Sequence, residues 1–192
     1  MKLTLIRHGL TEGNLRRLYY GSTDLPLTPQ GIAALQELTH TLGYPTAEVY
    51  YTSGIRRTEE TFAQIFGDLP HSILPGMREM DFGSFEMKSY DMLKDNPEFQ
   101  TWISGDIYHN CCPGGESAMQ VTDRALRALA PVLEAGRDAL CVTHGGVIAN
   151  LLCTWFPGSN YYDCLPEPGH GVQIFFSGSH PESYTPVPMP AQ

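Results

Sequence analysis

The sequence has little positive charge and no long hydrophobic run. Lys and Arg number 12 against 21 Asp and Glu, which gives a formal net charge of -9. Because a protein that binds nucleic acid needs a basic face, this balance argues against a polyanionic partner. No apolar run approaches the roughly 20 residues of a membrane-spanning helix. We therefore expect neither a nucleic-acid partner nor a membrane partner.

The sequence also lacks a cysteine pattern typical of disulfides. It has five Cys, an odd number, and no Cys-x-x-Cys pair. This usage fits a reducing compartment better than a disulfide framework. The polar tripeptide Arg7-His8-Gly9 lies too close to the start to leave room for a signal peptide. We expect a cytoplasmic protein.

Several motifs of cofactor and metal sites are missing. There is no Gly-rich loop ending in Gly-Lys-Ser/Thr and no His-Glu-x-x-His, and the seven His and 21 acidic residues show no metal-ligand spacing. We predict no metal and no cofactor. No internal repeat or linker divides the 192 residues, and four Pro fall within 181–192. We predict one domain over residues 1–180, followed by a proline-rich tail, 181–192, that is extended or disordered.

The first residues form an apolar segment that leads into polar ones. Lys2 to Ile6 has the pattern of a β-strand, and Arg7-His8-Gly9 follows directly. This places a cation, an imidazole and a flexible turn where open α/β sheets bind ligands. Phosphate suits these groups, because Arg offers a planar fork of donors and a neutral His can act as a nucleophile. A lone His at a strand end is more often structural, so this interpretation needs partners elsewhere.

Short strands and amphipathic helices alternate along the chain. Helices are predicted from Pro29 to Leu42, from Arg57, after Ser117 and from Gly145 to Phe156. Strands are predicted at 48–52, 139–143 and 172–176, and the second delivers His144 to its carboxyl end. This alternation predicts an α/β protein, a three-layer α/β/α sandwich with a mostly parallel central sheet. Between residues 81 and 112, scattered aromatic residues predict helical, lid-like segments with a small satellite core.

Six separated motifs then carry a family resemblance. They are Arg7-His8-Gly9 with Asn14 and Gly21, Asp24 to Thr28 with Gly31, Thr52-Ser53 with Arg57 and Thr61, Arg78 to Gly83, Pro113 to Ser117, and Thr143 to Gly146. In this order and spacing, the chain resembles the histidine phosphatase superfamily, with its phosphoglycerate-mutase-like fold, over about residues 3 to 176. It is most similar to the α-ribazole phosphatase branch.

The resemblance implies a role for each polar residue of these motifs. His8 would attack phosphorus and form a phosphohistidine, while Glu79 would give a proton to the leaving group and later activate water. Three cations would surround the phosphoryl oxygens and stabilise the charge of the transition state: Arg7, Arg57 and His144. Hydrogen bonds to phosphate would come from Asn14, Gly21 and Gly145. Without the family pattern, a solvated charge is the better interpretation of Arg57, and a structural salt bridge that of Glu79.

Three positions depart from the family pattern. Met87 stands where a Gly is common, Leu18 where an Arg is common, and Ala149 where relatives often have Arg. Each could alter substrate fit, but none removes a catalytic residue.

Three functions are compatible with the sequence. The first is a phosphatase acting on a small-molecule phosphomonoester, with α-ribazole 5'-phosphate as one candidate. The second is a phosphoglycerate mutase, which the short chain disfavours. The third is a non-catalytic phospho-ligand-binding regulatory domain, which the intact set of motif residues argues against. The sequence leaves the substrate and the oligomeric state open, a homodimer being one alternative.

Overall fold

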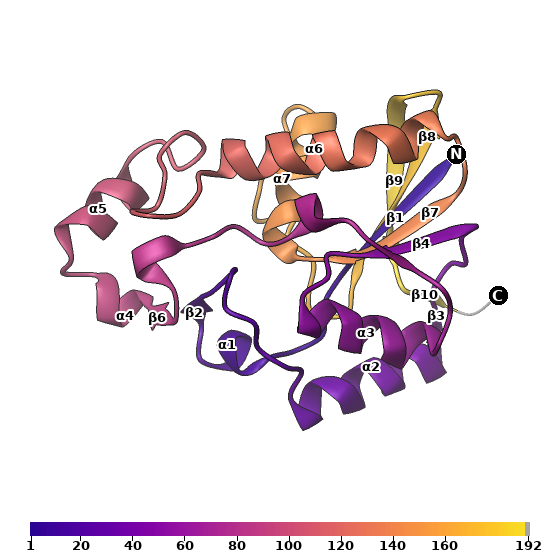
Figure 1. Ribbon diagram of the computed structural model, residues 1–192, viewed down its shortest axis with the longest axis horizontal. Coiled ribbons are helices and arrows are strands. Elements are labelled where there is room, and N and C mark those ends of the chain that lie inside the picture. Colours follow the sequence, from indigo (N-terminus) through magenta and orange to yellow (C-terminus); the bar gives the residue numbers. More distant parts are fainter. Residues whose placement is uncertain (191–192) are drawn as a thin grey trace.

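The computed structural model describes residues 1–190, and within them a six-stranded sheet forms the centre of the molecule (Figure 1). The strand order is β5-β4-β7-β1-β8-β9. These strands are β1 Lys2–Arg7, β4 Val49–Thr52, β5 Ser72–Ile73, β7 Ala139–Thr143, β8 Gly171–Ser177 and β9 His180–Val187. The pairs β4/β5, β4/β7 and β1/β7 are parallel, whereas β1/β8 and β8/β9 are antiparallel.

The two central strands are apolar because both faces of the sheet are covered. Leu3, Leu5 and Ile6 of β1 are fully buried, as is every residue of β7. Helices α2 Pro29–Thr41 and α3 Arg56–Phe66 lie on one side of the sheet, and α6 Ala118–Glu134 and α7 Gly145–Trp155 on the other (Figure 1). The predicted three-layer α/β/α sandwich with a mostly parallel sheet is confirmed.

Capping residues mark the starts of two predicted helices. Thr28 Oγ1 accepts a hydrogen bond from the amide of Gly31 at the start of α2, where Pro29 is the first helical residue. Ser117 and Gln120 form a capping box at the start of α6. Helix α7 begins directly after His144 and ends before Pro157, which cannot continue it.

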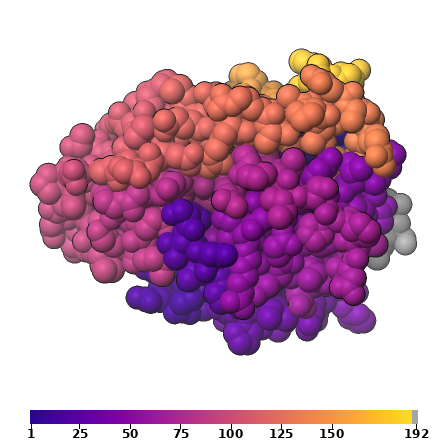
Figure 2. All heavy atoms as spheres, in the orientation of Figure 1, coloured from indigo at the N-terminus to yellow at the C-terminus, as the bar shows by residue number. Residues whose placement is uncertain are grey.

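Short elements build the end of the molecule beside the carboxyl ends of the central strands. They are α1 Glu12–Leu15, β2 Leu18–Tyr19, η1 Pro75–Met77, η2 Gly83–Phe85, β6 Lys88–Ser89, α4 Tyr90–Leu93 and α5 Pro97–Ser104. In the space-filling view, the chain around residues 90–110 closes this end of the molecule (Figure 2). The predicted helical segments are present, but Phe85, Phe99 and Trp102 belong to the main hydrophobic core and form no separate satellite.

The proline-rich segment differs from the predicted tail. Residues 180–187 are extended, but as β9 they pair with β8 along its whole length, and β10 Met189–Pro190 pairs with β3 Leu42–Gly43. Because β9 is the edge strand of the sheet, Pro181 and Pro186 can be accommodated where a central strand would exclude them. Residues 191–192 of the predicted tail lie outside the described residues.

Within residues 1–190, no helix is both long enough and apolar enough to cross a membrane.

Candidate active site

Two neighbouring parallel strands bring the two motif histidines together. Arg7, the last residue of β1, is in register with Thr143, the last residue of β7. The amide of His8 donates to the carbonyl of Thr143 at 2.9 Å, and the ring centres of His8 and His144 are 5.3 Å apart. The pairing of β1 with β7 therefore places both imidazoles at one edge of the sheet.

The hydrogen bond of His8 determines which ring nitrogen is free. Nδ1 of His8 lies 2.7 Å from the carbonyl oxygen of Gly9. Since a carbonyl can only accept, Nδ1 carries the proton in this bond, and Nε2 of the neutral ring has the lone pair. Nε2 is therefore the ring nitrogen of His8 with a free lone pair.

A directed chain of hydrogen bonds orients His144. The hydroxyl of Thr58 donates to the carbonyl of Ile55 at 2.7 Å, so its oxygen is the acceptor for Ser53 Oγ at 3.1 Å. The hydroxyl proton of Ser53 is then used, and Ser53 Oγ accepts from His144 Nε2 at 2.9 Å. In this arrangement His144 Nδ1 carries a proton only when the ring is a cation.

Burial lowers the pKa of both histidines. His8 is 3% exposed and His144 0%. Loss of solvation, and then the charges of Arg57 and Arg7, hold the pKa of His8 well below its ordinary value of 6.5. Burial and then Arg57 do the same for the pKa of His144. Both rings are therefore neutral at pH 7 in the free protein.

The two motif arginines are held by main-chain carbonyls. Arg7 Nη1 donates to the carbonyl of Pro166 at 2.7 Å. Arg57 is completely buried in α3, and its two terminal nitrogens donate to the carbonyls of Thr23 at 2.9 Å and Gly21 at 2.8 Å. Its guanidinium also lies 5.0 Å from the ring centre of Tyr20. The neighbouring Arg56 is exposed and pairs with Glu60.

Some buried nitrogen atoms of this cluster have no hydrogen-bond partner. Among the described residues 1–190, Arg7 Nε, Arg57 Nε and His144 Nδ1 are buried side-chain atoms without one. Leaving a buried donor unpaired costs about 1–3 kcal/mol. A phosphoryl group has the acceptor oxygens and the charge that such donors require.

Glu79 lies beside the start of α7, and hydrogen bonds hold both its side chain and its main chain. Its carboxylate accepts from the amides of Met80 at 2.9 Å and Gly146 at 3.1 Å. The main chain on its other side is held by Arg124, which also pairs with Glu116. Glu79 lines both the larger and the smaller of two cavities at this end of the sheet.

The predicted phosphate-binding residues occupy different places. Asn14 lines the larger cavity; its side-chain oxygen accepts from Thr11, so its NH₂ group is what it can offer a ligand. Gly145 lets α7 begin against Arg7, since a Cβ there would lie 3.1 Å from Arg7 Nε. Gly21 lines only the smaller cavity: its carbonyl binds Arg57, and its amide donates to Glu86 at 2.8 Å.

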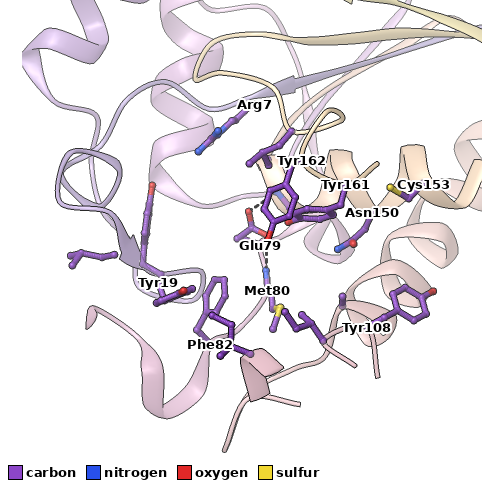
Figure 3. A pocket seen from close by; sticks show the side chains of 18 of the residues that line it. Arg7, Tyr19, Glu79, Met80, Phe82, Tyr108, Asn150, Cys153, Tyr161 and Tyr162 are labelled. Carbon is purple, nitrogen blue, oxygen red and sulfur yellow. Dashed lines mark hydrogen bonds between the residues drawn. The ribbon is translucent and has the colours of Figure 1, made fainter. Parts of the chain in front are cut away.

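The larger cavity has a volume of about 890 Å³ and opens beside His8, Arg7 and Glu79. Arg57 and His144 do not line it and lie fully buried beneath. Most of its wall is aromatic or aliphatic (Figure 3). The aromatic residues are Tyr19, Tyr20, Phe82, Trp102, Tyr108, Tyr161 and Tyr162. Tyr161 and Tyr162 form an edge-to-face pair, and Tyr162 is 77% exposed.

Sequence reasoning did not identify several residues that shape the site. Glu86 accepts from the amides of Gly21, Ser22 and Thr23, so it fixes the turn whose carbonyls bind Arg57. Partial burial acts to raise the pKa of Glu86, but hydrogen bonds from the Thr23 hydroxyl and from the amides of Phe82, Gly21 and Ser22 outweigh it and lower that pKa. Its position in the stretch after Phe82-Gly83 was the one available signal.

The structure shows the environment of the three residues that depart from the family pattern. Leu18 lines the larger cavity, where it adds an apolar surface. Met87 has a φ of 61°, a left-handed conformation that Gly adopts without strain. Ala149 is completely buried in the core, so this position gives the cavity no cation.

A sheet edge that gathers two histidines, two arginines and a glutamate beside an apolar cavity defines an enzyme of the phosphoryl-transfer class. A family model described as the histidine phosphatase superfamily (branch 1) matches residues 3–164. The chain belongs to this family and is an enzyme of the phosphatase or mutase type.

Known relatives include proteins of both types. The adenosylcobalamin/alpha-ribazole phosphatase of Escherichia coli K12 is 32% identical over 158 residues, which cover 79% of this chain and 77% of the relative. A 2,3-bisphosphoglycerate-dependent phosphoglycerate mutase of Bradyrhizobium diazoefficiens is 32% identical over 162 residues, 78% of each protein. The crystal structure of a putative alpha-ribazole-5'-P phosphatase from Escherichia coli superimposes with a TM-score of 0.85 at 27% identity, covering 100% of this chain and 96% of that one.

Proposed function

We propose that this protein is a phosphatase that hydrolyses a small-molecule phosphomonoester through a phosphohistidine at His8. The observation that carries this proposal is a pair of buried, unpartnered donors, Arg7 Nε and Arg57 Nε, beside a histidine whose Nε2 bears the lone pair. The unpartnered Nδ1 of His144 becomes a third donor when that ring is protonated. Donors already in place can stabilise charge as it develops on the phosphoryl oxygens. A neutral imidazole attacks a dianionic ester without charge repulsion.

The mechanism uses two displacements at phosphorus. Nε2 of His8 forms a bond to phosphorus while the bond to the ester oxygen breaks, and Glu79 gives its proton to the leaving alkoxide. The carboxylate of Glu79 then takes a proton from water, which attacks phosphorus and releases His8. His144 accepts a proton at Nδ1 when the dianion binds, because that anion favours the charged ring. Its bond to Ser53 at Nε2 is kept throughout.

The lining of the larger cavity favours hydrolysis of an ester with a mostly apolar leaving group. Among the described residues, Arg7 is the one Lys or Arg that lines it. A phosphoglycerate carries a carboxylate in addition to its phosphate, and Ala149 supplies no cation for it. Aromatic and aliphatic walls instead suit a large, flat leaving group. Together with the alpha-ribazole phosphatases among the relatives, this supports α-ribazole 5'-phosphate as the substrate to test first.

A substrate panel tests this choice. The purified protein is assayed with α-ribazole 5'-phosphate, simple alkyl phosphates and 2- and 3-phosphoglycerate, the last two with 2,3-bisphosphoglycerate present. We expect release of inorganic phosphate, with the highest kcat/KM for the ester that has the aromatic leaving group. Interconversion of the phosphoglycerates faster than hydrolysis of any ester would instead identify a mutase.

The covalent step has its own test. Rapid quenching of the wild-type protein during turnover should trap an acid-labile, base-stable phosphate on His8. His8→Ala should remain folded but lose turnover, because water cannot replace an imidazole held in line. Near-normal rates in His8→Ala would exclude the phosphohistidine mechanism.

A further inference from the structure

Helix α7 turns one side-chain amide toward the larger cavity. The cavity-lining residues Gly146, Asn150, Cys153 and Thr154 are four, three and one positions apart, which puts them on one face of the helix. The other residues in the middle of α7 are apolar and buried: Val147, Ile148, Ala149, Leu151 and Leu152.

Asn150 has an unusual environment for a polar residue. It is 8% exposed, and its main-chain carbonyl accepts from Thr154 Oγ1 at 2.8 Å. No residue of the described chain, 1–190, forms a hydrogen bond with its side-chain amide, which lies at the cavity (Figure 3). Asn is also a weaker helix former than its two neighbours in the sequence, Ala149 and Leu151. The residue is buried as a whole, but its amide is accessible in the cavity and has no protein partner, so it is free to bond a ligand group there.

The residues around Asn150 indicate which kind of leaving group would carry the polar atom that bonds to its amide. The cavity wall contributed by α5 and the residues after it is apolar or aromatic, with Trp102, Ile103, Ile107 and Tyr108. A flat aromatic ring fits between such walls, and its edge is the part that can carry a hydrogen-bonding atom. Asn150 is five residues beyond Gly145 in α7, which is about 8 Å along the helix axis at 1.5 Å per residue. A phosphate bound at the start of the helix would therefore leave the far part of its leaving group at the level of Asn150.

We propose that Asn150 is a specificity-determining residue, whose amide hydrogen-bonds a polar atom on the edge of an aromatic ring in the leaving group. The proposal rests on the proposed phosphatase function and adds a chemical requirement to the substrate. An aromatic heterocycle satisfies Asn150, whereas a pure hydrocarbon ring of the same shape leaves its amide unpaired. A site built for a hydrogen bond discriminates against the analogue that lacks it.

Three esters of matched shape test this requirement. They are 2-(benzimidazol-1-yl)ethyl phosphate with a ring acceptor, 2-(indol-3-yl)ethyl phosphate with a ring donor, and 2-(naphthalen-1-yl)ethyl phosphate with neither. All three release a primary alkoxide, so the demand on the proton donor is the same. We expect the wild-type protein to favour at least one heterocycle over naphthalene by about tenfold in kcat/KM, the effect of one unpaired buried group.

The variant Asn150→Leu has the same number and branching of side-chain heavy atoms but no polar atom, and it should bring this ratio close to one. Thr154→Ala is the matched control, because it removes a hydroxyl from the same helix face that is already bonded to a carbonyl; it should keep the wild-type ratio. Calorimetric binding of the three esters to His8→Ala gives the same comparison without turnover. A preference that persists in Asn150→Leu, or equal rates for all three esters in the wild type, overturns the role of Asn150. Absence of hydrolysis of every ester by the wild type would instead count against the phosphatase itself.

Discussion

Arg124 donates from Nη2 to the main-chain carbonyl of Glu79 at 2.9 Å. The same guanidinium binds both carboxylate oxygens of Glu116 at 2.8 Å and, through Nη1, the carbonyls of Gly76 and Arg78. A rigid, doubly paired arginine thus fixes the backbone from which the side chain of Glu79 projects. Its effect on the reaction is through the position of that carboxyl group.

Replacing Arg124 by Met should slow phosphoenzyme formation from an alkyl phosphate by roughly 10- to 100-fold, since small displacements of a reacting group have effects of this size. An activated aryl phosphate, whose leaving group needs no proton, should be slowed much less. Single-turnover quenching measures both rates. Arg127→Met, an exposed arginine one turn along α6, is the control and should change neither. Equal slowing of both esters would assign Arg124 a merely structural role.

Glu79→Gln should show the same selectivity more strongly. The amide keeps the size and polarity of the carboxyl group but has no acidic proton to give. Phosphoenzyme formation should therefore slow greatly for an alkyl ester and slightly for an activated aryl ester. Single turnovers are needed, because in the proposed mechanism Glu79 would also act in the hydrolysis step that both esters share. Uniform slowing with reduced thermal stability would leave the general acid to be found elsewhere. Glu116, held by Arg124, and Asp81 would be the next residues to test.

Arg57 and Arg56 are adjacent in the sequence but should differ in their effect on catalysis. Arg57→Gln removes a buried cation next to both histidines and should lower kcat/KM by about 10² to 10³. Arg56→Gln removes an exposed residue that pairs with Glu60 and should change kcat/KM less than twofold. Thermal unfolding of both variants shows whether a loss of rate reflects a loss of structure. Comparable losses of rate in two folded variants would contradict the assigned role of Arg57.

The free energy of unfolding should fall as the pH falls below 6.5. His8 and His144 have pKa values well below 6.5 in the folded protein, chiefly through burial, whereas the unfolded chain protonates them near 6.5. The unfolded state then binds more protons, so stability decreases by at most about 1.4 kcal/mol per pH unit for each histidine. Urea unfolding between pH 7.5 and 5.5 measures this slope.

His8→Asn removes one of the two titrating rings and should reduce the slope. Saturating sulfate should reduce it too, because a bound dianion favours the charged form of His144 in the folded state. A stability that is constant or rises as the pH falls through this range would contradict the inferred neutrality of the rings.

The sequence predicted those parts of the protein that depend on local pattern. A few consecutive residues are enough to recognise the apolar strands that end in Arg7-His8 and in Thr143-His144, and a helix cap such as Thr28. Arg124 has no such signal and Glu86 has only its place after Phe82-Gly83, because most of their partners are main-chain groups that only the folded chain brings near. The same holds for β9: prolines are typical of a tail, and only the place of this strand at the edge of the sheet makes them acceptable.

The pairing of β1 with β7 has a consequence for how the enzyme acquires activity. Most of the chain lies between the two strands, so closing this loop costs entropy before the contact contributes any stability. Pairings of such long sequence separation slow folding. A partly folded chain that has its helices but not this contact has no two-histidine centre at all. Recovered activity during refolding is therefore a readout of the completed sheet, and it should lag behind signals from local helix formation.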